Sequence, residues 1–145
     1  TQDITVLNGD TFYAIDHQSL YRAHADGQLI TMALQPVSEA LRYGTVVTDD
    51  TKTVISFKGA HAGPGLINAG VYILNTHIFE HIELPLSFSF EKDFLEEYLE
   101  QLRPQGIIDE SFFIDIGIPR DYERAQIAIP DFFAPGPEEE HPRGR

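Results

Sequence analysis

Residues 4–10 have the sequence Ile4-Thr5-Val6-Leu7-Asn8-Gly9-Asp10, and the rest of the chain can be interpreted outward from them. The first four residues form a β-branched run that is typical of a buried strand, and Asn-Gly predicts a tight turn directly after it. Asp10 is thereby placed just past the carboxyl end of the strand. Open α/β sheets bind ligands at this place, and a carboxylate there can hold a Mg²⁺ ion that bridges substrate phosphates.

A strand-helix-strand unit follows from this first strand. Residues 17–25 carry apolar side chains at helical spacing, and Asp26-Gly27 closes the predicted helix. Residues 29–34, Leu-Ile-Thr-Met-Ala-Leu, predict the next strand. Such units build parallel sheets, so an α/β fold is expected.

Further strands and helices are predicted along the rest of the chain. Residues 44–48 and 53–57 are β-rich runs around an Asp-rich turn, which is typical of a hairpin. Apolar residues at helical spacing predict a helix over residues 90–102, with Ser89 as its N-cap. The remaining expectations are short helices over 37–41 and 76–81, strands over 66–74, 107–108 and 112–114, and a last helix over 119–129 with Tyr122, Ala125 and Ile129 facing inward.

Length, charge and cysteine content limit the possible classes of protein. The chain has 145 residues, of which 42% are hydrophobic, and this is enough for one core and one domain. Its formal net charge of −13 repels a phosphate backbone, so no nucleic-acid partner is expected. No apolar run approaches the roughly 20 residues of a membrane span, and there is no cysteine for a disulfide. We expect a soluble, cytoplasmic protein without a membrane partner.

The end of the chain differs in composition from the rest. Residues 130–145 are rich in proline and glutamate and hold few apolar side chains, so burial cannot offset the entropy lost on ordering them. We therefore predict a folded domain over residues 1–129 and a disordered tail over residues 130–145.

A second acidic residue, Asp115, follows a strand-like run, Phe112-Phe113-Ile114, and precedes Ile116-Gly117. Two carboxylates that converge from separate strand ends would form the oxygen-rich site that Mg²⁺ prefers. The same pattern also fits two aspartates that each cap a turn. Spacing alone leaves both interpretations open.

The motifs around both aspartates resemble those of sugar-phosphate nucleotidyltransferases. The resemblance runs from about Ile4 to Ile129, and several spaced motifs in order form a specific signal. These motifs are Val6-Leu7-Asn8-Gly9-Asp10, Arg42-Tyr43-Gly44, Ile55-Ser56-Phe57, Gly65-Leu66-Ile67-Asn68-Ala69-Gly70-Val71-Tyr72, Phe90-Glu91-Lys92-Asp93, Phe113-Ile114-Asp115-Ile116-Gly117 and Pro119-Arg120-Asp121-Tyr122. The resemblance implies a partial Rossmann-like nucleotidyltransferase fold, with a mixed, mostly parallel sheet and flanking helices. Residues 65–70 are most similar to members that act on mannose or heptose 1-phosphates with guanosine nucleotides.

Enzymes of this family transfer a nucleoside monophosphate from a nucleoside triphosphate (NTP) to a sugar 1-phosphate and release pyrophosphate. Catalysis rests on positioning and on charge neutralisation by Mg²⁺. The resemblance implies that Asp10 and Asp115 are the catalytic metal ligands. Asn68 and Gly70 would line the sugar pocket, although a turn residue and a bulge glycine fit them equally well. Glu91 is another sugar-binding candidate, although the first turn of any helix favours a glutamate.

Three features depart from the family pattern. The glycine-rich loop that binds the triphosphate is missing, because the chain starts just before the Asn-Gly-Asp motif. Relatives place a Glu-Lys pair after the position of Phe57, and here only Lys58 remains as a substrate-binding substitute. Ile118 stands where a threonine that caps the last helix is common. We therefore expect the C-terminal half of the domain, truncated and inactive alone, which forms a homo-oligomer that covers its exposed sheet edge.

Two other interpretations remain open. One is a non-catalytic remnant that serves as a binding or oligomerisation module. The other is a zinc hydrolase, because His77, Glu80 and His81 match the pattern H-x-x-E-H, in which two histidines one helical turn apart bind zinc and the glutamate activates water. Exposed histidines on an amphipathic helix explain the same residues. Arg42-Tyr43-Gly44 is interpreted as architectural, with a packed Tyr43 ring and a tight turn at Gly44.

Overall fold

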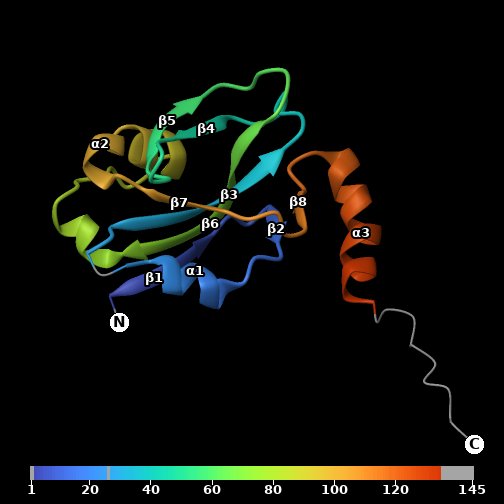
Figure 1. Cartoon of the computed structure of the whole chain (residues 1–145), viewed down its shortest axis with the longest axis horizontal. Helices are drawn as coiled ribbons and strands as arrows, with labels where there is room; N and C mark the ends of the chain where they lie inside the picture. Colours follow the sequence, from blue (N-terminus) through green and yellow to red (C-terminus); the bar gives the residue numbers. More distant parts are fainter. Residues whose placement is uncertain (1, 26, 135–145) are drawn as a thin grey trace, which may run out of the picture.

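The computed structural model describes residues 2–25 and 27–134, and its main body is one mixed β-sheet with helices on both faces (Figure 1). The strands of this sheet are β1 (Asp3–Leu7), β3 (Ile30–Val37), β4 (Thr45–Thr48), β5 (Val54–Lys58), β6 (Gly65–Asn75) and β7 (Gln105–Ile108). They hydrogen-bond in the order β5-β4-β6-β3-β7, and β1 pairs with the second half of β6. The predicted α/β class is confirmed.

The direction of the strands differs from the expectation. β6 runs antiparallel to β1, β3 and β4, whereas only β3 and β7 form a parallel pair. The prediction of a mostly parallel sheet is therefore wrong. β1 and β3 run in the same direction, as a strand-helix-strand unit requires. They do not pair with each other, because the antiparallel strand β6 lies between them and pairs with both.

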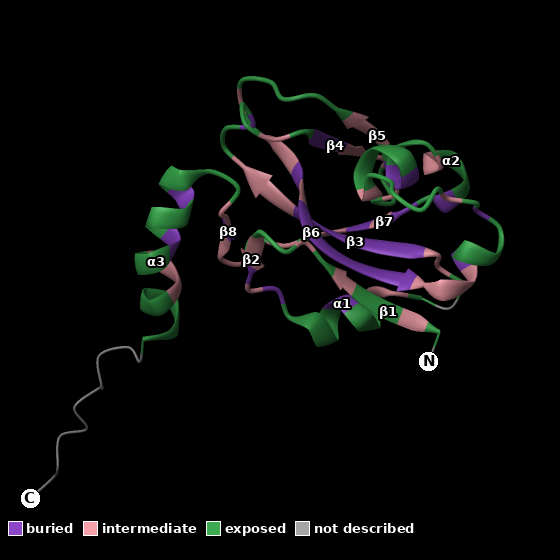
Figure 2. Ribbon diagram, turned by 180° about the vertical axis from the view of Figure 1, so that it is seen from behind, coloured by how far each residue is buried: buried purple, intermediate pink, exposed green. Residues whose placement is uncertain are grey.

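Successive side chains of β6 point to opposite faces of the sheet. Both faces are buried, because a separate cluster of apolar residues covers each one. On one face, Val71 and Ile73 pack with Leu20 of α1 (His17–Ala23). On the other face, Tyr72 and Leu74 pack with apolar residues of two helices, η2 (Phe90–Glu96) and α2 (Leu99–Leu102). Figure 2 shows this buried band running through β3 and β6. The layers are thus helix, sheet and helix, as predicted.

Several predicted elements form, but some differ in type. The hairpin of β4 and β5 is confirmed, and Asp49 in its turn accepts hydrogen bonds from the backbone N–H groups of Thr51 and Thr53, each at 2.9 Å. The predicted α-helix over 90–102 is a π-helix, η2, followed by the short α2. The predicted helix over 76–81 is the 3₁₀-helix η1 (Thr76–Glu80). The helix predicted over 37–41 is absent from these described residues, because β3 continues to Val37 and Ala40 bridges to His61.

A small second sheet and the last helix lie beside the main sheet (Figure 1). β2 (Thr11–Tyr13) pairs antiparallel with β8 (Phe113–Asp115). The helix α3 (Pro119–Phe133) is longer than predicted, because it continues through Pro130, and the predicted boundary at 129 is wrong. Its last turn packs on the rings of Phe12 and Phe112 through Phe132, with ring centroids 5.9 Å and 5.1 Å apart. Residues 135–145 of the predicted tail lie outside the described residues.

The start of α3 explains two details of the sequence. Ile118 occupies the N-cap position and makes no side-chain hydrogen bond there, as expected for a residue without a side-chain oxygen. Of the three residues predicted to face inward, only Ala125 is fully buried, whereas Tyr122 is 53% exposed. The reason is that α3 contacts the β2–β8 ribbon rather than the face of the main sheet.

The outer edge of β1 is unpaired among the described residues. β1 has β6 on one side and no strand on the other, and Leu7 and Ile4 expose 58% and 41% of their surface. An open edge with apolar side chains favours pairing with another chain segment. The predicted homo-oligomer remains a prediction that rests on this edge. In the described part of the chain, no helix combines the length and apolarity that crossing a bilayer requires.

The central place of β6 makes a prediction about stability. Leu74 is fully buried at 0% exposure, so Leu74→Ala should lower the free energy of unfolding by about 2–5 kcal/mol through lost packing and a residual cavity. Urea denaturation followed by circular dichroism measures this change. Leu86→Ala is the matched control, because Leu86 is fully exposed, and it should change stability by less than about 0.5 kcal/mol. Equal effects of the two substitutions would contradict the described core.

Candidate functional site

The two predicted aspartates lie side by side, although they are far apart in the sequence. Thr11 of β2 is the register partner of Asp115 of β8, and the N–H group of Ile116 donates a hydrogen bond to the backbone oxygen of Asp10 at 2.8 Å. The small β2–β8 ribbon therefore brings the two residues together. We expected them to converge at strand ends of one large sheet, and the structure instead uses this separate pair of strands.

Gly117 keeps the space between the two carboxylates open. A Cβ atom at Gly117 would lie 3.0 Å from Oδ1 of Asp115 and 3.7 Å from Oδ2 of Asp10. The N–H group of Gly117 also donates a hydrogen bond to Oδ1 of Asp115 at 2.6 Å, which fixes the orientation of that carboxylate. A side chain at position 117 would fill the space that both acidic groups face.

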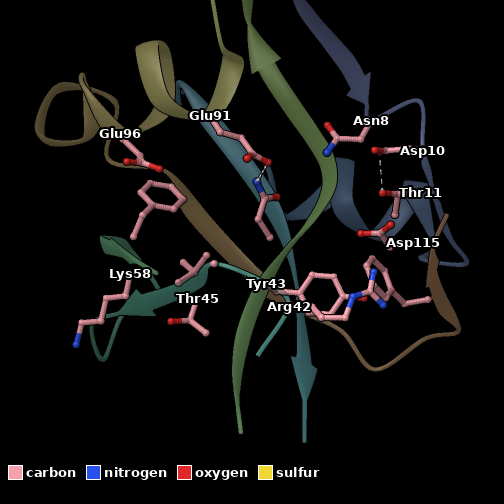
Figure 3. A pocket seen from close by; sticks show the side chains of 15 residues that line it. Asn8, Asp10, Thr11, Arg42, Tyr43, Thr45, Lys58, Glu91, Glu96 and Asp115 are labelled. Carbon is pink, nitrogen blue, oxygen red and sulfur yellow. Dashed lines mark hydrogen bonds between the residues drawn. The ribbon is translucent and has the colours of Figure 1, made fainter. Parts of the chain in front are cut away.

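These carboxylates line a cleft with a volume of about 290 Å³ (Figure 3). Its charged side chains come from separate elements: Asp10 and Asp115 from the ribbon, Glu91 and Glu96 from η2, and Lys58 from β5, with Arg42 just before β4. The full lining consists of Asn8, Asp10, Thr11, Arg42, Tyr43, Gly44, Thr45, Val46, Phe57, Lys58, Asn68, Glu91, Glu96, Phe113 and Asp115. The cleft thus combines carboxylates, amides and two cationic side chains.

Asn68 and Gly70 have different roles. Asn68 lines the cleft, and its Nδ2 atom donates to the Tyr72 hydroxyl at 2.6 Å and to Oε1 of Glu91 at 3.2 Å. Gly70 does not line the cleft: it has a φ of +71° where β6 bulges against β3, and a Cβ atom there would lie 2.8 Å from the side chain of Asn8. Gly70 is therefore a bulge glycine rather than a lining residue, whereas the side chain of Asn68 faces the cleft.

Glu91 is held in an environment that favours its protonated form. Burial raises the pKa of its carboxyl group, and the negative charges of Glu96 and Asp10 raise it further, against a smaller opposing effect of Lys92. The side chain lies in the first turn of η2, which is a π-helical turn of the kind that often occurs at functional sites. Glu91 therefore holds its proton more strongly than an ordinary glutamate does.

Arg42 and Tyr43 are among several cleft residues that the sequence analysis did not assign to the site. Arg42 and Tyr43 were interpreted as architectural, yet both line the cleft. The architectural interpretation also holds in part, because the Tyr43 ring packs against Phe113 with centroids 6.4 Å apart. No local signal identifies them, because the pairing of β4 with β6 that brings this segment near Asn68 joins stretches that are distant in the sequence.

The donor set fits Mg²⁺ better than zinc. Mg²⁺ is commonly bound by one or two carboxylates together with substrate phosphates, and the paired oxygens beside Gly117 provide this arrangement. Across the residues that the structure describes, no three histidine, aspartate or glutamate side chains cluster as a zinc site with three protein ligands would need. His77 and Glu80 hydrogen-bond to each other at 2.8 Å on a 3₁₀-helix, whose three-residue turn does not align His77 with His81. The zinc hydrolase is not favoured.

Known proteins share both the sequence and the fold of this chain. D-glycero-alpha-D-manno-heptose 1-phosphate guanylyltransferase of Aneurinibacillus thermoaerophilus is 45% identical over 128 residues, which cover 86% of this chain and 55% of that protein. The protein of the same name from Campylobacter jejuni is 42% identical over 118 residues, or 81% of this chain and 52% of its own length. The crystal structure of HddC from Yersinia pseudotuberculosis matches with a TM-score of 0.74 and 33% identity, over 86% of this chain and 54% of HddC.

HddC has also been solved as a complex with GMP-PN, and that structure matches with the same TM-score of 0.74. This chain spans about half the length of each of these relatives. The family model for nucleotidyl transferase matches residues 1–131, which include both aspartates and every other residue that lines the cleft. The fold of the chain matches about half of HddC, and the chain belongs to the nucleotidyl transferase family.

Proposed function

We propose that this chain is the sugar-binding half of an enzyme that transfers a nucleoside monophosphate from an NTP to a sugar 1-phosphate and releases pyrophosphate. The observation that carries the proposal is the pair of carboxylates, Asp10 and Asp115, beside Gly117 in a cleft that also holds Arg42 and Lys58. A phosphate needs cations around it, and a divalent metal needs oxygen ligands. The cleft supplies both kinds of group.

In this proposal Asp10 and Asp115 hold Mg²⁺, which neutralises phosphate charge when it is bound. The remaining work falls to positioning, because phosphoryl transfer requires an attacking oxygen in line with the leaving group. Lys58 borders the cleft from the strand β5, but its exposed ammonium group points outward in Figure 3, so it would have to turn toward the cleft to bind the phosphate of the sugar. Asn68 and Glu91, which are hydrogen-bonded to each other, are placed to bind its hydroxyl groups.

The substrates follow from the relatives. Two of them are named D-glycero-alpha-D-manno-heptose 1-phosphate guanylyltransferase, so we propose a heptose or mannose 1-phosphate as the sugar and GTP as the nucleotide. Activity is proposed to need a further segment of about the same size, because the chain spans only about half of these relatives. The open edge of β1 is the place on the described surface where such a segment can join the sheet.

Sugar-phosphate binding is the first test of this proposal. Isothermal titration calorimetry with mannose 1-phosphate and Mg²⁺ should show binding, whereas mannose without its phosphate should bind far more weakly. Asp10→Asn and Asp115→Asn should each weaken the Mg²⁺-dependent binding by roughly tenfold or more, because each removes one charged ligand. Asp50→Asn is the control: Asp50 is an exposed carboxylate in the β4–β5 turn and should leave binding unchanged. Equal losses in all three variants would contradict the proposed site.

Pyrophosphate release tests the need for a second segment. The chain mixed with GTP, heptose 1-phosphate and Mg²⁺ should release no pyrophosphate above background, because we propose that the triphosphate binds to the part of the relatives that this chain does not cover. Addition of the complementary half of the Aneurinibacillus relative should give release that Asp10→Asn abolishes. Release of pyrophosphate by the chain alone would show that activity does not need a second segment.

The raised pKa of Glu91 can be measured directly. A carbon-13 NMR titration should give Glu91 a midpoint above the ordinary value of about 4.3, because burial and neighbouring negative charges favour its protonated form. Glu96→Gln should move the midpoint back toward that value, because it removes one of these charges. Asp49→Asn, in the β4–β5 turn, should leave it unchanged. An ordinary midpoint in the unaltered chain would exclude the described environment of Glu91.

A further inference from the structure

Asp121, in the first turn of α3, is a buried carboxylate outside the proposed metal site. Only 4% of its surface is exposed. A buried charge is costly unless it is paired, so its partners indicate why it is there. They are the Nη1 atom of Arg42, which bonds to Oδ2, and the Nη2 atom of Arg124, which lies 3.5 Å from Oδ1.

Arg42 is the stronger of these two partners. Arg124 lies on the same helix turn, is 61% exposed and is at the long end of ion-pair distances, so water screens much of its effect. Arg42 comes from the segment before β4, and its bond to Asp121 joins that segment to the start of α3. Burial would lower the pKa of Arg42, but the hydrogen bond to Asp121 and the nearby charges, including Asp115, raise it overall. The guanidinium therefore stays charged next to the paired aspartates.

The other side of Arg42 faces the cleft. Figure 3 shows its guanidinium next to Tyr43 and below Asp115, and Cζ lies 5.3 Å from the centre of the Tyr43 ring. Arginine has five N–H donors in one plane. Asp121 uses those on Nη1, and within the described part of the chain no other nitrogen of Arg42 donates a hydrogen bond. A fixed, planar set of donors is thus left for a ligand.

The charge balance of the cleft indicates which ligand this is. A sugar monophosphate carries a charge between about −1.5 and −2 at neutral pH. The lining contains four carboxylates, Asp10, Asp115, Glu91 and Glu96, and its only cationic side chains are Arg42 and Lys58. A metal ion held by the aspartates would offset mainly their own charge, so the phosphate would depend on the side-chain cations, and Arg42 is the one that lies near Asp115 in Figure 3.

The geometry points to Asp121 as a positioning residue that holds Arg42 in place to bind the phosphate of the sugar 1-phosphate. This inference rests on the proposed function, and it adds Arg42 as a phosphate-binding residue and α3 as the element that fixes it. Arginine suits this role because its flat guanidinium can bind a carboxylate along one edge and a phosphate along another. Asp121 does not line the cleft, so it acts through Arg42 alone.

A double-mutant cycle in calorimetry tests the inference, with mannose 1-phosphate and Mg²⁺ as the probe and the full chain as the protein. Arg42→Ala should weaken binding roughly 10- to 100-fold through the loss of charge-assisted hydrogen bonds. Asp121→Asn should weaken binding in the unaltered chain but add no loss to Arg42→Ala, because its effect passes through Arg42. Arg124→Ala, which removes only the exposed partner, should bind like the unaltered chain. Urea denaturation of every variant separates binding from stability.

Arg42→Lys keeps the test informative if Asp121→Asn does not fold. Lysine retains the charge that pairs with Asp121 but lacks the planar donors, so binding should fall well below that of the unaltered chain while stability changes little. Unchanged binding in Arg42→Lys, or losses from Arg42→Ala and Asp121→Asn that simply add, would overturn the inference. If the unaltered chain bound no mannose 1-phosphate, the proposed function itself would fail. If it bound normally and only the cycle failed, the role of Asp121 alone would be wrong.

Discussion

The burial of β6 on both faces is the constraint on which the other elements depend. β1, β3 and β4 all hydrogen-bond to this strand, and the helices on each side cover the side chains that it presents. The pairing of β6 with β3 shifts register at one stretch, the bulge at Asn68-Ala69-Gly70. Because the strand turns out of register there, Asn68 can face the cleft while Tyr72, four residues later, stays fully buried and supports it with its hydroxyl group.

The acidic site lies on a much smaller unit, the β2–β8 ribbon. Two three-residue strands bury little surface by themselves, so the ribbon needs support from its neighbours. That support is aromatic: Tyr13 packs on Phe113 at 5.7 Å, and Phe12 packs on Phe112 at 5.9 Å. The last turn of α3 covers the same cluster through its two terminal phenylalanines. The helix thus stabilises the ribbon at one end and holds Arg42 through Asp121 at the other.

The sequence was sufficient to locate most of the strands. Residues 4–7, 53–57 and 66–74 are apolar or β-branched runs bounded by turns, and all three are strands. Residues that meet through long-range pairing were harder to predict. Nothing near residues 65–75 shows that this strand inserts between β1 and β3, because the register depends on hydrogen bonds between segments distant in the chain. The same limit explains why Arg42 was missed as a cleft residue.

Helix type and helix ends were also beyond local patterns. The spacing of apolar residues over 90–102 is the same for an α-helix and for a π-helical turn followed by a short α-helix, so periodicity cannot separate them. Pro130 usually predicts the end of a helix, but α3 passes through it. The compensation is tertiary, because Phe132 and Phe133 reach the aromatic cluster only if the helix continues.

The net charge of −13 repels the anionic substrate proposed for this chain at long range, whereas the charges that line the cleft act at short range. Salt screens exposed charges beyond about 8–10 Å, so the bulk of the acidic surface contributes little inside a partly closed site. In the proposed function, the two aspartates would repel a phosphate until a cation lies between them, whereas Arg42 and Lys58 would attract it. Selectivity for phosphate over other anions then depends on where those two cations are fixed. A mobile arginine would pair with any of the four neighbouring carboxylates, and the buried carboxylate of Asp121 prevents this by holding one edge of the guanidinium away from them.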